Sequence, residues 1–293
     1  MKNRFLELLI CAILVFSIIP FGKNIKASQT NNNAKQVNTP EQMAAVMREK
    51  ANNNTARMKG KITQSQVNET IKQKLIVKTR DEIENTYGAN SVYYYTVGNY
   101  QILFYDTADE AKNACEKLKK DLPGTTIFQD IPITLKEAAK DNGSDEVAAY
   151  DGIKKMGMDQ LKEEKDSWKN KSAKVAGIDS GINVDHQWFK NRLDRENSIN
   201  LALDEGNEDD KTKPAYNDTK QGHGSHVAGI ITQATPEEVQ VMAIRVFSAL
   251  GTASYATITN AVDYAVEHKA DIINMSLSLI HISEPTRQAE ISY

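Results

Sequence analysis

The chain has 293 residues, of which 40% are hydrophobic and 26% are charged. This length is enough for one large domain or for two modest domains with separate cores. The formal net charge of -3 and the isoelectric point near 6.0 argue against the strongly basic surface that binds nucleic acid or anionic membranes. We therefore expect no nucleic-acid partner.

The N-terminus has the pattern of a secretory signal. Lys2 and Arg4 precede an apolar run, Leu8–Ile19, and Ala27 is a small residue at a suitable cleavage position. A transmembrane helix needs about 20 apolar residues, so a retained anchor is the less favoured alternative. We expect residues 1–27 to be a signal peptide, and the protein to be secreted, extracellular or cell-wall associated, without a stable membrane anchor.

Two cysteines occur in the chain, Cys11 and Cys115. A lipoprotein signal at Cys11 is disfavoured because the bulky Ile10 precedes it. Once the signal is removed, no disulfide can form within one chain, so stability must come from packing and from any bound ions. Cys115 lies on the apolar side of a predicted helix and is expected to be a core residue rather than a reactive thiol.

Residues 28–70 are predicted to be a linker, disordered for most of its length. The segment is rich in Asn, Gln, Lys and Thr, and it has few bulky apolar residues to offset the entropy of ordering. Within it, Glu41–Ala51 can form a short helix, because Met43, Val46 and Met47 fall on one helical face.

Residues 71–135 show the pattern of a small α+β domain. Two aromatic-rich strands, Ser91–Thr96 and Tyr100–Tyr105, flank a Val-Gly-Asn turn. Thr107–Leu122 has apolar residues at helical spacing and ends before Pro-Gly. The other predicted elements are two strands and a short helix: Lys74–Thr79, Thr125–Ile133 and Asp81–Tyr87. The resulting β-α-β-β-α-β order is a ferredoxin-like unit, which does not indicate a function by itself.

A charged segment, residues 136–150, follows the small domain and contains Asp-Asn-Gly-Ser, a strong turn signal. We expect this segment to join the small domain to a second domain that starts at about residue 151. The predicted helix Tyr150–Asp166 opens that domain.

A carboxylate follows a buried strand in the second domain. Lys174–Ile178 is a short apolar run, typical of a strand with both faces covered in a parallel sheet. Asp179 comes directly after it, at the strand end where ligands and catalytic groups of open α/β sheets lie. Taken alone, such an Asp more often only organises the turn, and this alternative stays open at this point.

A histidine stands at the start of a predicted helix, Ser225–Gln233, with a glycine on either side. His223 can act as a general base if its other ring nitrogen donates to a carboxylate. Small Ala228 and Gly229 would let the helix lie close to the sheet. His226 makes an H-x-x-H pair with His223, but no Glu lies between them and no third ligand is evident, so we predict no metal site here.

Together, Val175–Gly181 and Gly222–Gly229 resemble the Asp and His segments of the subtilisin-like serine peptidases. The resemblance implies an α/β fold: a parallel-sheet subtilisin-like catalytic domain, truncated, over residues 151–278, preceded by a small α+β ferredoxin-like propeptide domain. It also implies catalytic roles for Asp179 and His223, and protein or peptide substrates that are cleaved outside the cell by a serine-type endopeptidase.

By the same resemblance, residues 71–135 correspond to the family's inhibitory propeptide, an intramolecular inhibitor whose C-terminal tail lies in the substrate cleft until it is cut. The pro/mature junction then falls within residues 136–150. An unrelated accessory domain is the alternative.

The resemblance extends through a strand, Val239–Phe247, a helix, Tyr255–His268, and a further strand, Asp271–Leu277. In the family, two extended edges bind a peptide between them by strand addition. The residues expected to bind substrate are Gly251, Thr252, Ala253, Ser254, Tyr255, Ser276, Leu277 and Ser278. Tyr255 and Ile258 would rim the S4 pocket, whereas Ser278 stands where the family usually has glycine.

No cofactor is required by the resemblance, and no metal is assigned to the catalytic site. Family members often bind structural calcium, and the acidic loop Asp204–Asp210 has suitable oxygen ligands. A solvated charged insertion is the favoured alternative for this loop. Asn217 and Asp218 are expected either to edge the cleft near the S2 subsite or to form a plain turn.

Family members have the chain order Asp, His, Ser. The serine normally lies in a Gly-Thr-Ser-Met-Ala-like segment, after an oxyanion-hole Asn, and neither is present here. Ser254 is rejected as the nucleophile because it lies on the predicted substrate edge. Residues 279–293 show no strand period, helix cap or family likeness, and we expect them to be foreign sequence joined to a truncated gene. The chain as written is therefore expected to be inactive and poorly soluble.

A function of a different class remains as the alternative. The chain would then be a catalytically dead binder or inhibitor built on the domain at residues 71–135. The presence of both Asp179 and His223 favours the peptidase, because a long-inactive enzyme has no reason to keep both.

Overall fold

A computed structural model of the chain describes residues 34–56, 63–95, 98–135, 154–155, 157, 172–204, 206, 212–219 and 222–277. The predicted signal peptide, the predicted junction at 136–150 and the tail at 279–293 lie outside these ranges, as does most of the predicted helix Tyr150–Asp166. Within the described ranges, every helix falls short of the length and apolarity that crossing a membrane requires.

The C-terminal part is built on a four-stranded parallel sheet with the order β11-β7-β9-β8. Its strands are β7 (Ala173–Asp179), β8 (Ile199–Asn200), β9 (Val239–Arg245) and β11 (Ile272–Asn274). Val241 and Ala243 of β9 pack under the helix α7 (His223–Ala234), whereas Met242 and Ile244 pack against α8 (Tyr255–Glu267) on the opposite face. The α/β class with a parallel sheet is thus confirmed, and most apolar side chains of the central strands β7 and β9 are buried.

The N-terminal part is built on a five-stranded sheet with the order β1-β3-β4-β2-β5. Its strands are β1 (Lys35–Val37), β2 (Lys74–Lys78), β3 (Ser91–Tyr95), β4 (Tyr100–Phe104) and β5 (Ile127–Gln129). The helix α3 (Ala108–Asp121) covers one face, with Cys115 buried as predicted. The other face carries α1 (Pro40–Ala56) and α2 (Gln64–Lys72). Thr107 and Glu110 form a capping box at the start of α3, which explains why this helix begins where the sequence indicates.

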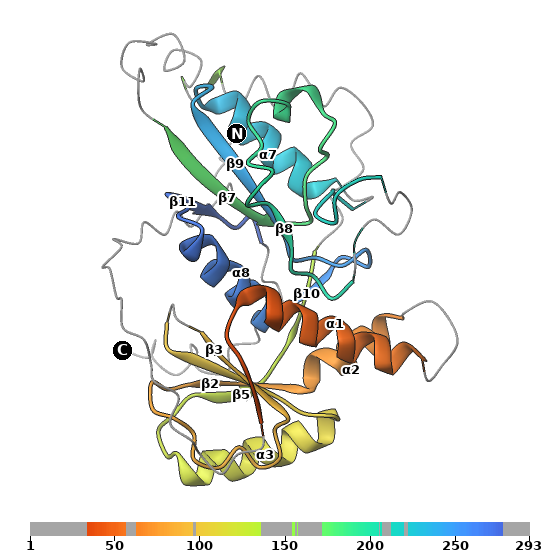
Figure 1. The fold of residues 1–293 in the computed structure, drawn as a ribbon, viewed down its shortest axis with the longest axis vertical. Helices are drawn as coiled ribbons and strands as arrows, with labels where there is room; N and C mark the ends of the chain where they lie inside the picture. The colour runs from red at the N-terminus through yellow and green to blue at the C-terminus, as the bar shows by residue number, and fades with distance from the viewer. Residues whose placement is uncertain are drawn as a thin grey trace, which may run out of the picture.

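The two sheets share the helices that lie between them. Ala44 of α1 belongs to the same apolar cluster as Ala261 and Ala265 of α8, and Ala256 of α8 packs in the cluster under the five-stranded sheet. Figure 1 shows the resulting layers, with α7 on one outer side, α3 on the other, and α8 and α1 between the sheets. The N-terminal part is therefore packed directly on the parallel-sheet part.

The prediction that residues 28–70 form a disordered linker is wrong for the described part of that segment, which forms β1, α1 and most of α2. The buried side chains Met43, Met47 and Val67 lie against the five-stranded sheet. Their partners are far away in the sequence, so a composition average over a short window could not reveal that enough apolar surface is buried.

The short helix predicted at Asp81–Tyr87 is also wrong, since the described residues there form bends and irregular backbone. Thr79 Oγ1 accepts a hydrogen bond from the Asp81 amide, and Asn85 Oδ1 accepts one from the Tyr87 amide. Such local side-chain acceptors compete with helical hydrogen bonds. The expected β-α-β-β-α-β order therefore lacks its first helix, although its strands and α3 are present.

The strand predicted at Thr125–Ile133 divides into two. After β5, the chain leaves the five-stranded sheet and forms β6 (Pro132–Thr134), which pairs antiparallel with β10 (Thr252–Ser254). The last predicted strand, Asp271–Leu277, is shorter than expected, because only β11 within it is a strand. The division at the end of β5 places a segment of the N-terminal part on the edge of the C-terminal part.

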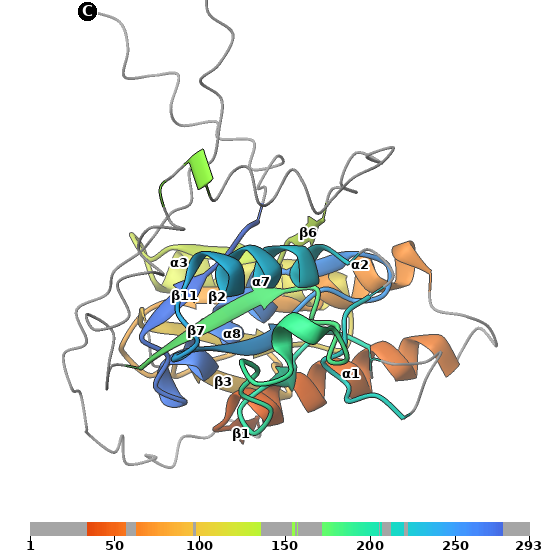
Figure 2. The ribbon, with the colours of Figure 1, turned by 90° about the horizontal axis from the view of Figure 1, so that it is seen from above.

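The helix α7 runs alongside β7 (Figure 2), and its first turn lies very close to the end of that strand. A Cβ atom on Gly224 would overlap the carbonyl oxygen of Gly181 and would lie 3.2 Å from Cβ of Asp179. Gly181 itself has φ +113°, a backbone conformation that glycine adopts readily. Ala228 faces the sheet, as the sequence suggested, and Gly224 adds a closer approach at the first turn. Gly229 instead faces the ring of Trp188.

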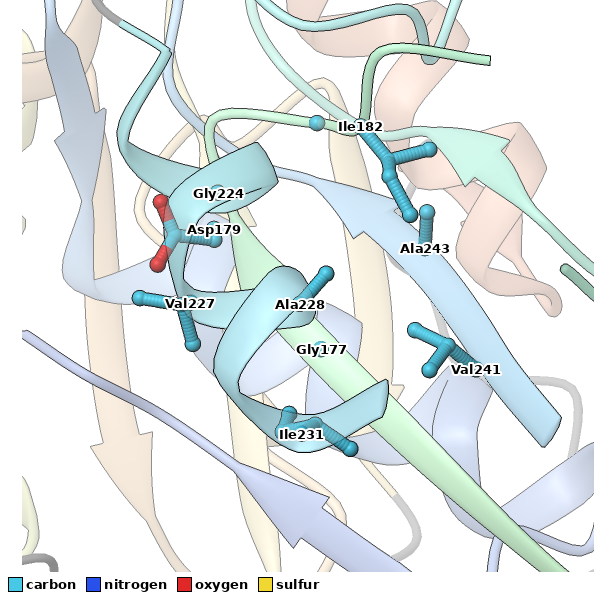
Figure 3. A pocket seen from close by; sticks show the side chains of 10 residues that line it. Gly177, Asp179, Ile182, Gly224, Val227, Ala228, Ile231, Val241 and Ala243 are labelled. Carbon is cyan, nitrogen blue, oxygen red and sulfur yellow. The ribbon is translucent and has the colours of Figure 1, made fainter. Parts of the chain in front are cut away.

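Little space remains between α7 and the sheet. The cavity there has a volume of about 10 Å³, and Gly177, Ala228, Val241 and Ala243 are among the residues that line it (Figure 3). This volume is far below the several hundred cubic ångström of a ligand pocket. It is a packing space under α7 rather than a substrate site.

A buried ion pair of the N-terminal part lies where that part meets α8. Lys74 Nζ lies 3.1 Å from Asp130 Oδ2, and the two side chains are 1% and 0% exposed. Asp130 Oδ1 also accepts a hydrogen bond from the amide of Ala256 in the first turn of α8. Burial raises the pKa of Asp130 and lowers the pKa of Lys74, so each charge depends on the other.

We predict that Gly224→Ala lowers the free energy of unfolding by about 1–3 kcal/mol, because the added methyl group must push α7 away from Gly181. Gly229→Ala is the matched control, since its Cβ would meet only Trp188 ring carbons at 3.3 Å. Urea unfolding followed by far-UV circular dichroism measures both. Equal stability of the two variants would show that the close approach at Gly224 is not a constraint.

We also predict that Lys74→Met costs on the order of 3–5 kcal/mol of unfolding free energy, because the carboxylate of Asp130 is then buried without a counter-charge. The double variant Lys74→Met/Asp130→Asn should be clearly more stable than Lys74→Met alone, since Asn keeps an acceptor for the Ala256 amide. Guanidinium unfolding compares the two. A double variant that is no more stable than the single one would contradict the coupling.

Candidate active site

The structure brings Asp179 and His223 into contact. Asp179 is the last residue of β7, and His223 is the first residue of α7. Asp179 Oδ1 lies 2.8 Å from His223 Nδ1, and it also accepts a hydrogen bond from the Ser180 amide at 2.7 Å. The two residues are adjacent because β7 ends beneath the first turn of α7, where Gly181 and Gly224 permit the approach.

The two side chains differ in exposure, in a way that suits acid–base chemistry. The Asp179 side chain is 4% exposed, whereas the His223 side chain is 24% exposed. With Nδ1–H donated to the buried carboxylate, a neutral imidazole carries its lone pair on Nε2. The pair can therefore accept a proton at Nε2 while Asp179 stabilises the imidazolium that results.

The pKa of His223 is raised above its ordinary value of 6.5. The main cause is the hydrogen bond to Asp179, opposed by burial of the ring and supported by the charges of Asp179 and Asp218. Because the folded pKa exceeds the unfolded one, this contribution to stability is complete below about pH 6.5. It is lost as the pH rises through the folded pKa.

The predicted substrate edge exists as β10, and its residues Thr252, Ala253 and Ser254 are buried. In the register with β6, Thr252 faces Thr134, Ala253 faces Ile133 and Ser254 faces Pro132. The ladder continues beyond the strands, since the Leu135 amide donates to the Gly251 carbonyl at 2.8 Å and the Tyr255 amide donates to the Ile131 carbonyl at 3.2 Å. The edge is thus occupied by a segment of the same chain.

Ser254 is placed for structure rather than for catalysis. Its Oγ accepts a hydrogen bond from the Thr257 amide at 3.1 Å and caps the N-terminus of α8. The residue is fully buried. This geometry agrees with the rejection of Ser254 as a nucleophile.

The other residues predicted to bind substrate lie in different surroundings. Tyr255 makes edge-on ring contacts with Tyr100 and Phe128, so the N-terminal part covers it. Leu277, like Ile258, packs against the apolar cluster beneath the parallel sheet. Ser276 Oγ accepts a hydrogen bond from Asn274, and Ser278 lies outside the described residues. The first predicted edge is thus present as β10, whereas the second, at Ser276–Ser278, is described only as far as Leu277.

The calcium prediction concerns a loop, Asp204–Asp210, that lies mostly outside the described residues. Within the described part, Asp204 forms an ion pair with Arg245 at 2.9 Å and accepts a hydrogen bond from the Ala249 amide. Over the described ranges, no group of three His, Cys, Asp or Glu side chains is arranged to hold a metal ion. Calcium binding stays a prediction.

Of three polar residues next to the Asp179–His223 pair, sequence patterns suggested a functional role for Asp218 alone and none for Ser180 or Ser225. Asp218, expected at a cleft edge or a plain turn, accepts hydrogen bonds from Ser180 and Ser225. Ser180 and Ser225 each lie within two residues of a member of the pair. A carboxylate shortly before the glycine-flanked His was the available signal, but sequence position does not show which hydroxyl groups it meets.

The C-terminal part of the chain, which contains this site, matches a known protein family. Residues 170–290 match the family described as the subtilase family, Peptidase S8. The matched range includes the sheet, α7, α8 and the Asp179–His223 pair. It also extends over most of residues 279–293.

Curated relatives are similar over the same region. The major intracellular serine protease of Bacillus subtilis is 35% identical over 118 residues, which are 37% of this chain and 35% of that protein. The intracellular serine protease of Paenibacillus polymyxa is 32% identical, covering 37% and 34%. Subtilisin E of Bacillus subtilis is 30% identical, covering 36% and 27%. The matches thus span about a third of the length of the first two relatives.

Among solved structures, the epidermin leader peptide processing serine protease of Staphylococcus aureus aligns with a TM-score of 0.40 and 17% identity, over 67% of this chain and 47% of that one. A TM-score of 0.40 is too low to show a shared fold. The family match and the curated relatives, in contrast, agree on one assignment. Residues 170–290 match the subtilase family, and the curated relatives that are similar over this region are serine proteases.

Proposed function

We propose that the chain supplies the general base and its orienting carboxylate, His223 and Asp179, to a serine-type endopeptidase. The observation that carries this proposal is the 2.8 Å contact between Asp179 Oδ1 and His223 Nδ1 at the carboxyl end of a parallel strand. In this arrangement His223 takes the proton of a serine nucleophile and later delivers it to the leaving amine. The match of residues 170–290 to a family of serine proteases supports the same reaction.

The nucleophilic serine of this proposal lies outside the described residues. Within those residues, the hydrogen bond of the His223 ring goes to Asp179, and Ser254 is buried as a helix cap. The complete reaction also needs donors for the oxyanion. We therefore assign to this chain the Asp and His part of an Asp-His-Ser triad and a peptide-binding edge.

We propose protein or peptide substrates that bind by adding a strand to β10. The support is that β6 already pairs with this edge in an antiparallel register. Ile133 and Leu135, two residues apart, are buried in the cluster of the C-terminal part, whereas Thr134 between them is exposed. This alternation is how an added strand is recognised, through main-chain pairing and alternate side-chain pockets.

We further propose that residues 71–135 act as an intramolecular inhibitor and that the junction to be cut lies within residues 136–150. Because β6 occupies β10, an incoming peptide cannot pair there at the same time. The contacts to α8 include polar ones beside the apolar packing: Tyr93 donates to Asp263 at 2.6 Å, and Asn260 donates at 2.9 Å to the carbonyl of Pro40, which precedes residues 71–135. Such groups can be hydrated after separation, which suits a removable partner.

We propose export as the route to the site of action, through a signal peptide at residues 1–27. The support is the sequence pattern of Lys2, Arg4 and the apolar run Leu8–Ile19. Two of the relatives are named intracellular serine proteases, and these names describe the location of those two proteins.

The product of the natural gene tests the proposed chemistry. A fluorophosphonate probe, which labels activated serines, is applied separately to culture supernatant and cell lysate. We expect a labelled product in the supernatant, and His223→Ala should abolish the labelling because the base is lost. His226→Ala, in the same helix, is the matched control and should be labelled. Equal labelling of both variants, or none of the unaltered product, would contradict the proposal.

The strand pairing is tested within the chain itself. Ile133→Asp should weaken the β6–β10 pair, because a buried side chain worth roughly 1.5–3 kcal/mol is replaced by a charge. Hydrogen exchange at the Tyr255 amide, which donates to the Ile131 carbonyl, should then be about 10- to 100-fold faster. Thr134→Asp, on the exposed side of the strand, is the control. Equally fast exchange in both variants would refute side-chain recognition at this edge.

A further inference from the structure

The helix that carries His223 has no cap of its own. Its N-cap residue is Gly222, which has a left-handed backbone with φ +66° and no side chain. The amide groups in the first turn of a helix have no partner within the helix. Other residues must therefore satisfy the amides that follow His223.

Hydroxyl and carboxylate groups from two loops satisfy these amides. The Gly224 amide donates to Ser180 Oγ at 2.9 Å. The Ser225 amide donates to Asp218 Oδ2 at 2.7 Å. These two acceptors are themselves joined, because Ser180 Oγ donates to Asp218 Oδ1 at 2.6 Å.

The Asp218 carboxylate consequently links the two halves of the candidate site. Ser180 is the neighbour of Asp179 in the sequence, and Gly224 is the neighbour of His223. Ser225 Oγ also donates to Asp218 Oδ2 and accepts a hydrogen bond from the Asn183 amide at 2.8 Å. One carboxylate thus connects the turn after β7 to the first turn of α7 through both of its oxygens.

Asp218 also contributes charge. A negative group at a helix N-terminus is favourable, because the first amides carry a partial positive charge. The charged groups that act on the imidazole are Asp179 from β7 and Asp218 from the loop before α7, and both raise the pKa of His223. Asp218 therefore stabilises the imidazolium form without contacting the ring.

We propose that Asp218 is a positioning residue for the Asp179–His223 pair, whose carboxylate holds the turn after β7 and the start of α7 at the separation that their hydrogen bond requires. This inference rests on the proposed function only in taking His223 as the base. It assigns to Asp218 a role distinct from a plain turn or a substrate subsite.

Proton NMR of the 293-residue chain tests the role without requiring hydrolysis. The readouts are the titration of the His223 ring and the downfield resonance of its Nδ1–H proton, which reports the hydrogen bond to Asp179. We expect Asp218→Asn to shift the titration to lower pH, because a negative charge is removed. We also expect it to weaken or abolish the Nδ1–H resonance, because the amide nitrogen of Asn cannot accept a hydrogen bond.

Asp194→Asn is the matched control. Asp194 is also a partly buried carboxylate, and it pairs with Lys174 at 2.8 Å and with Asn197. A general loss of stability would affect both variants, whereas only Asp218→Asn should change the His223 signals. Wild-type His223 titration and Nδ1–H signals in a folded Asp218→Asn chain would overturn the proposal.

Ser180→Ala gives the answer if Asp218→Asn does not fold. This variant keeps the Asp218 charge and removes the link to the turn after β7. The Nδ1–H resonance should weaken with little change in the titration, and an unaltered resonance would overturn the proposal. A failure of fluorophosphonate labelling would count against the proposed function but not against these results, since the NMR signals do not depend on a nucleophile.

Discussion

The approach of α7 to the end of β7 is the constraint on which the candidate site depends. Asp179 is fixed by the strand, and His223 is fixed by the helix, so their hydrogen bond exists only if these elements meet closely. Gly224 permits the contact because any side chain there would overlap the backbone of Gly181. A network centred on Asp218 then satisfies the amides that this close packing leaves without helical partners.

The helix α8 connects this site to the rest of the chain. One side of α8 packs on the parallel sheet, and the other side meets the N-terminal part through Asp263, Asn260 and the Ala256 amide. Asp130 has two roles in this region, since it pairs with Lys74 and binds the start of α8. The chain leaves the five-stranded sheet directly after Asp130 to form β6, so the ion pair anchors the segment that occupies β10.

Most strands and helices were predictable because their signals are local. The apolar run of β7, the helical spacing of α3 with its Thr107 cap, and the apolar face of α1 can each be recognised in a short window of sequence. The misjudged segments have signals that conflict or are distant. At Asp81–Tyr87, side chains that accept hydrogen bonds from nearby amides replace the expected helix. At residues 34–56, the helix was recognisable but the order of the whole segment was not, because its apolar partners come from the sheet that follows.

By itself, the sequence determined the residue types that can carry the chemistry, a carboxylate after a buried strand and a glycine-flanked histidine, because strand period, helix signals and glycine placement act between neighbouring residues. Only the tertiary structure decided which groups meet. The pairing of β6 with β10, the burial of α1 between two sheets and the hydroxyl partners of Asp218 all join residues far apart in the chain. Such contacts depend on how whole elements pack, and no local pattern encodes their geometry.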